Sequence, residues 1–378
     1  MTNIQSFYKD KVIVGFGVGV FLLCLGFFLY IYMYIHTDIQ LHSAILEDNL
    51  EKGLFPVPPL YYFTIHSLRL LLGHLGKASI VVLSTAVALK YLISIKISSE
   101  FRLNKFATLL FLFFILFITP ININIESNFL LGKLGINIWH NSTTIFLMPF
   151  ALLLYYVSYL TIKNDIIKPK YIWLMCILIL VNSLSKPSFL FVFIPVFPLM
   201  TILFSKNDLQ KVVLAFCMSF YSGLLVVLEY LYIYVKKPTQ DDGSVAFSFM
   251  YILKLYSNNI PLDMLTSMLL PLVILILFFK KTIKNKMYIY AVLLFVVAVL
   301  IFLFVQETGD RANHGNFVWQ VIVCNYILFL ISTFIGLEHI SEKGWKDYKS
   351  ILFLVTFLLH LVSGILYLFK IIAYGQWV

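Results

Sequence analysis

Long runs of apolar residues alternate with short polar segments along almost the whole chain. A helix needs about 20 apolar residues to cross the hydrocarbon core of a bilayer, and it must satisfy its own backbone hydrogen bonds there. On this basis the pattern predicts about eleven transmembrane helices, and the fold class is an all-α polytopic membrane protein. The spans are expected at residues 12–35, 78–95, 106–121, 143–162, 171–184, 189–204, 212–235, 262–279, 287–305, 317–335 and 351–372. No polar stretch is long enough for a soluble domain, so residues 1–378 are expected to form a single transmembrane domain.

The segment 59–76 is long enough for a short span, but it carries His66, Arg69 and His74. If this segment lies along the membrane surface, the loops on the amino-terminal side carry roughly twice as many Lys and Arg residues as the opposite loops. By the positive-inside rule, that distribution places the amino terminus in the cytoplasm. A span at 59–76 would scatter the basic clusters over both sides. We therefore predict an interfacial amphipathic helix within an outer loop of residues 36–77.

Composition agrees with this assignment and removes several classes of protein. Hydrophobic residues make up 61% of the chain and charged residues only 12%, against about 25% charged in soluble domains. The net charge of +10 comes from Lys and Arg in connecting loops, where they set topology, so it does not indicate nucleic-acid binding. The four cysteines have no paired spacing, and no nucleotide-binding loop, nucleophile elbow or zinc motif is present. Any chemistry is therefore expected on the outer side, on substrates that arrive from the lipid.

The first candidate residues lie in the first outer loop. Asp38 follows the first span directly, and Gln40 and His42 follow it at two-residue spacing. On a helix, Asp38 and His42 would share a face. A carboxylate at this place could act as a general base or bind a divalent metal ion, and the sequence leaves open whether a metal takes part. The alternative is that these are ordinary charges of a polar loop.

Two further outer segments carry polar groups close to the membrane. Trp139, His140 and Asn141 precede the fourth predicted span; the indole ring could stack on a sugar or a lipid carrier, while His140 and Asn141 hydrogen-bond to hydroxyl or phosphate groups. An aromatic anchor at the interface is the alternative. Lys186 lies in a turn too short to project far into water, which favours a role in binding phosphate.

The loop 306–317 is the densest polar cluster in the chain. The guanidinium group of Arg311 suits bidentate binding of phosphate, although the charged residues of the loop could instead neutralise one another in water. Two glycines flank the charged group and indicate a tight turn. We predict a binding loop that contributes Glu307, Asp310, Arg311, His314 and Asn316.

The first outer loop resembles that of the GT-C superfamily of integral membrane glycosyltransferases. In those enzymes an acidic residue comes just after the first span, and a His-Pro-Pro-like element and surface helices follow. Asp38 matches the acidic position, the stretch Pro58-Pro59-Leu60-Tyr61-Tyr62 resembles the proline element, and 59–76 resembles a surface helix. The resemblance covers the amino-terminal half in topology. It departs from the family at Ile39, where a second acid is common, and at Val57, where a His is common, so the base or metal ligand stays open.

The resemblance implies a polyprenyl-phosphate-linked sugar donor and transfer on the extracytoplasmic face to a glycan or lipid-linked acceptor. In physical terms, transfer needs a carboxylate to deprotonate the acceptor and cations to stabilise the departing phosphate. We expect Asp38 to supply the first, Lys186 and Arg311 the second, and Tyr61 with the loop histidines to contact the substrates.

Two other functions fit the same pattern. An O-antigen-type polysaccharide polymerase would use outer-face Arg and His residues in the same way. A lipid-linked-sugar flippase or a transporter fits the number of spans, but such proteins show repeated halves and mid-membrane charges, for which only Glu229 is a candidate. The Ile-, Lys- and Asn-rich composition suggests a bacterial inner membrane and a role in envelope or surface-polysaccharide assembly.

Overall fold

The computed structural model describes residues 10–123, 127–205, 207–235 and 244–375. Most of these residues are helical, with one short antiparallel strand pair formed by β1 (Val245–Phe247) and β2 (Val305–Glu307). The expectation of an all-α membrane protein is confirmed at this level.

Within the described residues, eight helices are long and apolar enough to cross a membrane. They are α2 (Lys11–Tyr34), α5 (Leu75–Ser98), α7 (Ser142–Lys163), α9 (Ser188–Ser205), α10 (Leu209–Tyr230), α15 (Lys286–Phe304), α16 (Trp319–Lys343) and α17 (Tyr348–Tyr374). The helix α10 continues as a π-helical segment, Leu231–Val235. A ninth span results if α12 (Ile260–Ser267) and α13 (Leu269–Leu277), which meet at 63°, are counted as one broken helix.

One predicted span is shorter than the sequence pattern indicated. The helix α8 (Pro169–Ser185) covers the whole of the predicted 171–184, whereas α6 (Lys105–Ile115) has only 11 residues and ends well before the predicted residue 121. Eleven residues rise about 16 Å, roughly half of the hydrocarbon core. The apolar stretch after α6 leaves the helix because other segments satisfy its backbone: the N–H of Thr119 bonds the carbonyl of His360, and that of Ile121 bonds Thr266. The count of eleven spans is therefore not confirmed.

Two helices join α2 to α5. They are α3 (Asp38–Glu51) and α4 (Pro59–Leu72). Pro59 occupies the first position of α4, where the missing N–H costs nothing, and Gly73 ends the helix with a left-handed φ of 73°. A helix thus forms over most of the predicted 59–76 segment. Its depth in the membrane stays a prediction.

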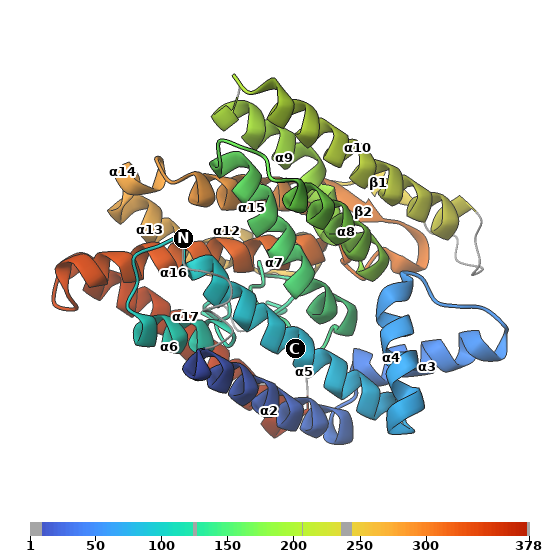
Figure 1. Ribbon diagram of the computed structural model, residues 1–378. Coiled ribbons are helices and arrows are strands. Elements are labelled where there is room, and N and C mark those ends of the chain that lie inside the picture. The colour runs from blue at the N-terminus through green and yellow to red at the C-terminus, as the bar shows by residue number, and fades with distance from the viewer. Residues whose placement is uncertain (1–9, 124–126, 206, 236–243, 376–378) are drawn as a thin grey trace.

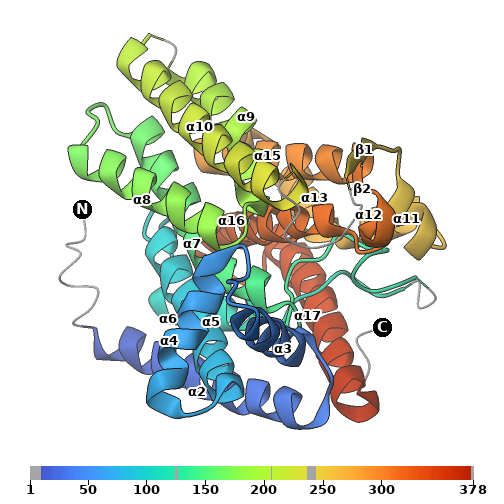
Figure 2. The same cartoon turned by 90° about the vertical axis from the view of Figure 1, so that its right-hand side faces the viewer.

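The helices enclose α16, whose apolar window is wholly buried, whereas α2 and α10 have mostly exposed apolar surfaces suited to lipid. In Figure 1, α3, α4, β1 and β2 gather at the right-hand end of the molecule, and α14 (Phe279–Thr282) lies at the opposite end with the turn between α16 and α17. Figure 2 shows α3 and α4 beside the ends of α5 and α8. The remaining short elements are α11 (Tyr251–Tyr256) and the 3-10 turns Gly309–Arg311 and Asn316–Val318.

A buried ion pair fixes the irregular segment between α6 and α7. Lys133 Nζ lies 2.6 Å from Asp263 Oδ1 on α12, and both side chains are 0% exposed. The Ser257 hydroxyl donates to the other oxygen of Asp263 at 2.6 Å. These contacts hold the segment that leads to Asn141 against the broken helix α12–α13.

Candidate functional site

Two of the predicted residues, Asp38 and Lys186, are joined through the side chain of a third, Asn141. The Nδ2 group of Asn141 donates to Asp38 Oδ2 at 2.8 Å, and Asn141 Oδ1 accepts from Lys186 Nζ at 3.1 Å. The three residues come from the start of α3, the cap of α7 and the turn between α8 and α9. The structure therefore joins a carboxylate, an amide and an ammonium group that lie far apart in sequence.

The local sequence places Asp38 by capping the helix it begins. The Thr37 hydroxyl accepts from the N–H of Ile39 at 3.2 Å, and Gln40 Oε1 accepts from the N–H of Thr37 at 2.9 Å. The Gln40 amide nitrogen also donates to the carbonyls of Tyr32 and Ile35, each at 2.9 Å. The side-chain amide of Gln40 is therefore engaged with the backbone at the start of α3, and its expected contact with a substrate stays a prediction.

The ammonium group of Lys186 donates to three side-chain oxygens. Besides Asn141, its Nζ donates to the hydroxyls of Thr143 at 3.1 Å and Thr144 at 2.9 Å, and it lies 4.5 Å from the centroid of the Trp319 ring. Burial lowers the pKa of Lys186 to about 7, while the charges of Asp38 and Glu307 act in the opposite direction. This ammonium group is therefore poised to gain or lose a proton near neutral pH.

The carboxyl group of Asp38 is perturbed in the opposite sense. Burial raises the pKa of Asp38 above its usual value, and the charge of Lys186 and the hydrogen bond from Asn141 offset part of that shift. A carboxylate with a raised pKa is a stronger base than an ordinary exposed aspartate.

A second carboxylate reaches the cluster from the loop 306–317. Glu307 is buried and accepts a hydrogen bond from the Asn316 amide, whose oxygen in turn accepts from Trp319 Nε1 at 3.1 Å. Glu307 is also part of β2, where it pairs with Val245. Trp319 then links this pair to Lys186.

Two histidines face the same cation. The Nδ1 of His42, one helical turn from Asp38, lies 2.6 Å from the Tyr62 hydroxyl, and its ring centroid is 5.8 Å from that of Tyr61. Burial, reinforced by the charge of Lys186, lowers the pKa of both His42 and His140 to about 4. Both imidazoles are neutral at pH 7, so each can hydrogen-bond to a hydroxyl group without adding charge.

Other predicted residues lie outside this cluster. Trp139 is buried in the core, with its ring 5.1 Å from the Phe27 ring and stacked on Phe117 at 5.7 Å, so its contact with a substrate stays a prediction. Asp310 and His314 are exposed, and Arg311 is partly exposed in the 3-10 turn.

The sequence analysis did not single out Thr143, Thr144 and Trp319. A signal was present for the threonines, because three consecutive hydroxyl residues, Ser142 to Thr144, directly follow a helix-capping Asn in an otherwise apolar chain. Trp319 gave no such signal, because a tryptophan at the start of a span is an ordinary interfacial anchor.

A metal site is not formed by the residues described: among them, no three His, Cys, Asp or Glu side chains are grouped to hold an ion. No family model and no curated protein matches the sequence. The resemblance to the GT-C superfamily therefore stays a prediction.

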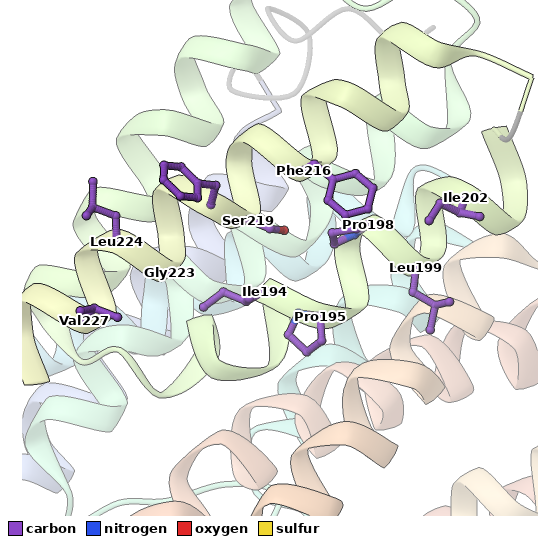
Figure 3. Close-up of a pocket in the computed structure, with 11 residues that line it drawn as sticks. Ile194, Pro195, Pro198, Leu199, Ile202, Phe216, Ser219, Gly223, Leu224 and Val227 are labelled. Carbon is purple, nitrogen blue, oxygen red and sulfur yellow. The ribbon is translucent and has the colours of Figure 1, made fainter.

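The structure contains two apolar grooves. One, of about 320 Å³, is formed by α4 and the end of α8, including Leu60 and Leu184, which are close neighbours of Tyr61 and Lys186 in sequence. The other, of about 730 Å³, runs between α9 and α10, and Figure 3 shows Pro195, Pro198 and Gly223 on its walls. Both are lined almost wholly by apolar side chains.

Proposed function

We propose that the protein is a membrane glycosyltransferase that moves a sugar from a polyprenyl-phosphate-linked donor to a glycan or lipid-linked acceptor. The observation that carries the proposal is the Asp38–Asn141–Lys186 cluster, with Glu307 as a second carboxylate. It combines a base with a partly desolvated cation beside neutral hydrogen-bonding groups. The site would face outward from a bacterial inner membrane, in assembly of the envelope or a surface polysaccharide.

The chemistry assigns one step to each charged group. The acceptor oxygen forms a bond to the anomeric carbon of the donor as the bond from that carbon to the phosphate oxygen breaks. Asp38 takes the acceptor proton, and the electron pair of the broken bond stays on the phosphate. Lys186, protonated, stabilises the added negative charge, and the bound phosphate in turn raises the affinity of Lys186 for its proton.

The histidines and grooves support the same type of substrate. Neutral His42 and His140 can hydrogen-bond to sugar hydroxyls beside Lys186 without competing for its charge. The groove at Leu60 and Leu184 offers apolar surface beside the polar cluster, as a lipid-linked donor requires.

The direct experiment measures sugar transfer from a labelled polyprenyl-phosphate donor by the protein reconstituted in liposomes. Asp38→Asn keeps the shape of the side chain but removes the base, and we expect the rate to fall about 100-fold or more. Asp48→Asn, which neutralises an exposed carboxylate on the same helix, is the matched control and should keep its rate. Full turnover by Asp38→Asn would exclude the assigned base.

A further inference from the structure

A further cavity, of about 690 Å³, lies between the start of α6 and the end of α16. These two segments are at the end of the molecule opposite α3 and α4 (Figure 1). Its lining includes the side chains of Arg102, Asn104, Phe106, Ile340, Ser341 and Trp345.

The cavity lies where candidate membrane spans end. The candidate spans α5 and α16 both end beside it, at Ser98 and Lys343. Phe106 is 66% exposed and Trp345 51% exposed, and aromatic rings at the ends of spans favour the membrane–water interface. The cavity therefore combines an apolar rim with a polar mouth at the place where a phospholipid changes from acyl chain to headgroup.

Among the residues that line the cavity, the cation is Arg102. Lys281 pairs with Glu338 at 2.9 Å and lies 3.6 Å from Glu342, and Glu338 also accepts from the backbone N–H of Arg102 at 3.1 Å. In the described part of the chain, the guanidinium group of Arg102 has no hydrogen bond or ion pair. A guanidinium group can bind a phosphodiester through two parallel hydrogen bonds.

Asn104 adds donors to the cavity. It uses its side-chain oxygen to accept from the N–H of Ala107 at 3.1 Å, which leaves its amide N–H groups as donors. The positive end of the α6 dipole lies at the same place. The Ser341 hydroxyl adds no donor, because it donates to the Leu337 carbonyl at 3.0 Å. The groups that favour an anion are therefore Arg102, Asn104 and the start of α6.

We infer that this cavity binds an anionic phospholipid, with the headgroup phosphate on Arg102 and Asn104 and the acyl chains along Phe106 and Ile340. The inference does not depend on the proposed function, because the site uses other residues at the other end of the helices. The exposed rings of Phe106 and Trp345 favour a lipid over a free phosphate ion, because a free phosphate ion has no apolar surface to bury against them.

The test is lipid retention by the purified full-length protein. Native mass spectrometry in mild detergent measures the apparent affinity for phosphatidylglycerol and for phosphatidylcholine of the same chains. We expect preference for phosphatidylglycerol, and a loss of about fivefold in Arg102→Gln, the effect of one interfacial basic residue. Arg102→Lys keeps the charge but lacks the planar guanidinium group, so its affinity for phosphatidylglycerol should lie between those of the unmodified protein and Arg102→Gln.

Arg69→Gln is the matched control, because it removes an equal charge from the last turn of α4, away from the cavity. It should retain phosphatidylglycerol like the unmodified protein. Equal losses in Arg102→Gln and Arg69→Gln would overturn the inference. So would equal retention of phosphatidylcholine, or displacement of the lipid by inorganic phosphate at comparable concentration.

Discussion

Replacing Lys133 by methionine tests whether the buried ion pair holds the segment that leads to the candidate site. At 2.6 Å and an effective dielectric constant of 20, the attraction between Lys133 and Asp263 is about 6 kcal/mol, and desolvation of the two charges offsets much of it. Removing one partner leaves the other charge buried and unpaired. We therefore expect Lys133→Met to lower the free energy of unfolding by about 3–5 kcal/mol.

The assay is unfolding in mixed micelles with increasing dodecyl sulfate, followed by circular dichroism. The control is Lys52→Met, because Lys52 pairs with Asp48 at 2.7 Å while both side chains are more than half exposed, at 61% and 58%. That exposed pair should contribute about 0.5 kcal/mol or less. A loss in Lys133→Met no larger than in Lys52→Met would refute the reasoning.

A double substitution separates the pair from its surroundings. Lys133→Met combined with Asp263→Leu removes both buried charges, so it should cost clearly less than the sum of the single changes. A strictly additive loss would mean that the two side chains act independently, against the contact described.

Two further predictions follow from the cluster and from helix packing. Because the pKa of Lys186 is lowered to about 7, its ammonium form is lost as the pH rises through that value. The kcat/KM of sugar transfer should therefore decline on the alkaline side. Lys186→Arg keeps its charge, so an active variant should show that decline at higher pH. A Cβ at Gly364 would lie 1.7 Å from the Phe117 carbonyl oxygen, so Gly364→Ala should lower the thermal unfolding temperature, whereas Gly15→Ala, with nothing within 4 Å, should not.

Much of the helical framework could be predicted from apolar run length alone. That measure failed after α6, because it counts apolar residues whatever their conformation. The stretch around Thr119 and Ile121 is apolar enough for a span, but it is extended and hydrogen-bonded to α17 and α12. Only the tertiary structure shows where those backbone groups find partners.

The candidate site was partly accessible from sequence. Asp38 and Lys186 could be singled out because charges beside apolar runs are costly, and Asn141 because it precedes a predicted span. Their contact depends on how three separate turns meet, which no local pattern encodes. The same limit explains Trp139, whose position before a span suggested an interface while the fold places it against Phe117.

The side-chain amide of Asn141 affects the protonation of Asp38 and Lys186 before a ligand binds. Because its nitrogen faces Asp38 and its oxygen faces Lys186, it separates two opposite charges that would otherwise form a direct contact pair. Direct contact would favour the charged form of each group, because opposite charges stabilise one another. The intervening amide weakens that effect, which is consistent with the lowered pKa of Lys186 and the raised pKa of Asp38. Glutamine is one methylene too long to keep this spacing, and aspartate would add a negative charge.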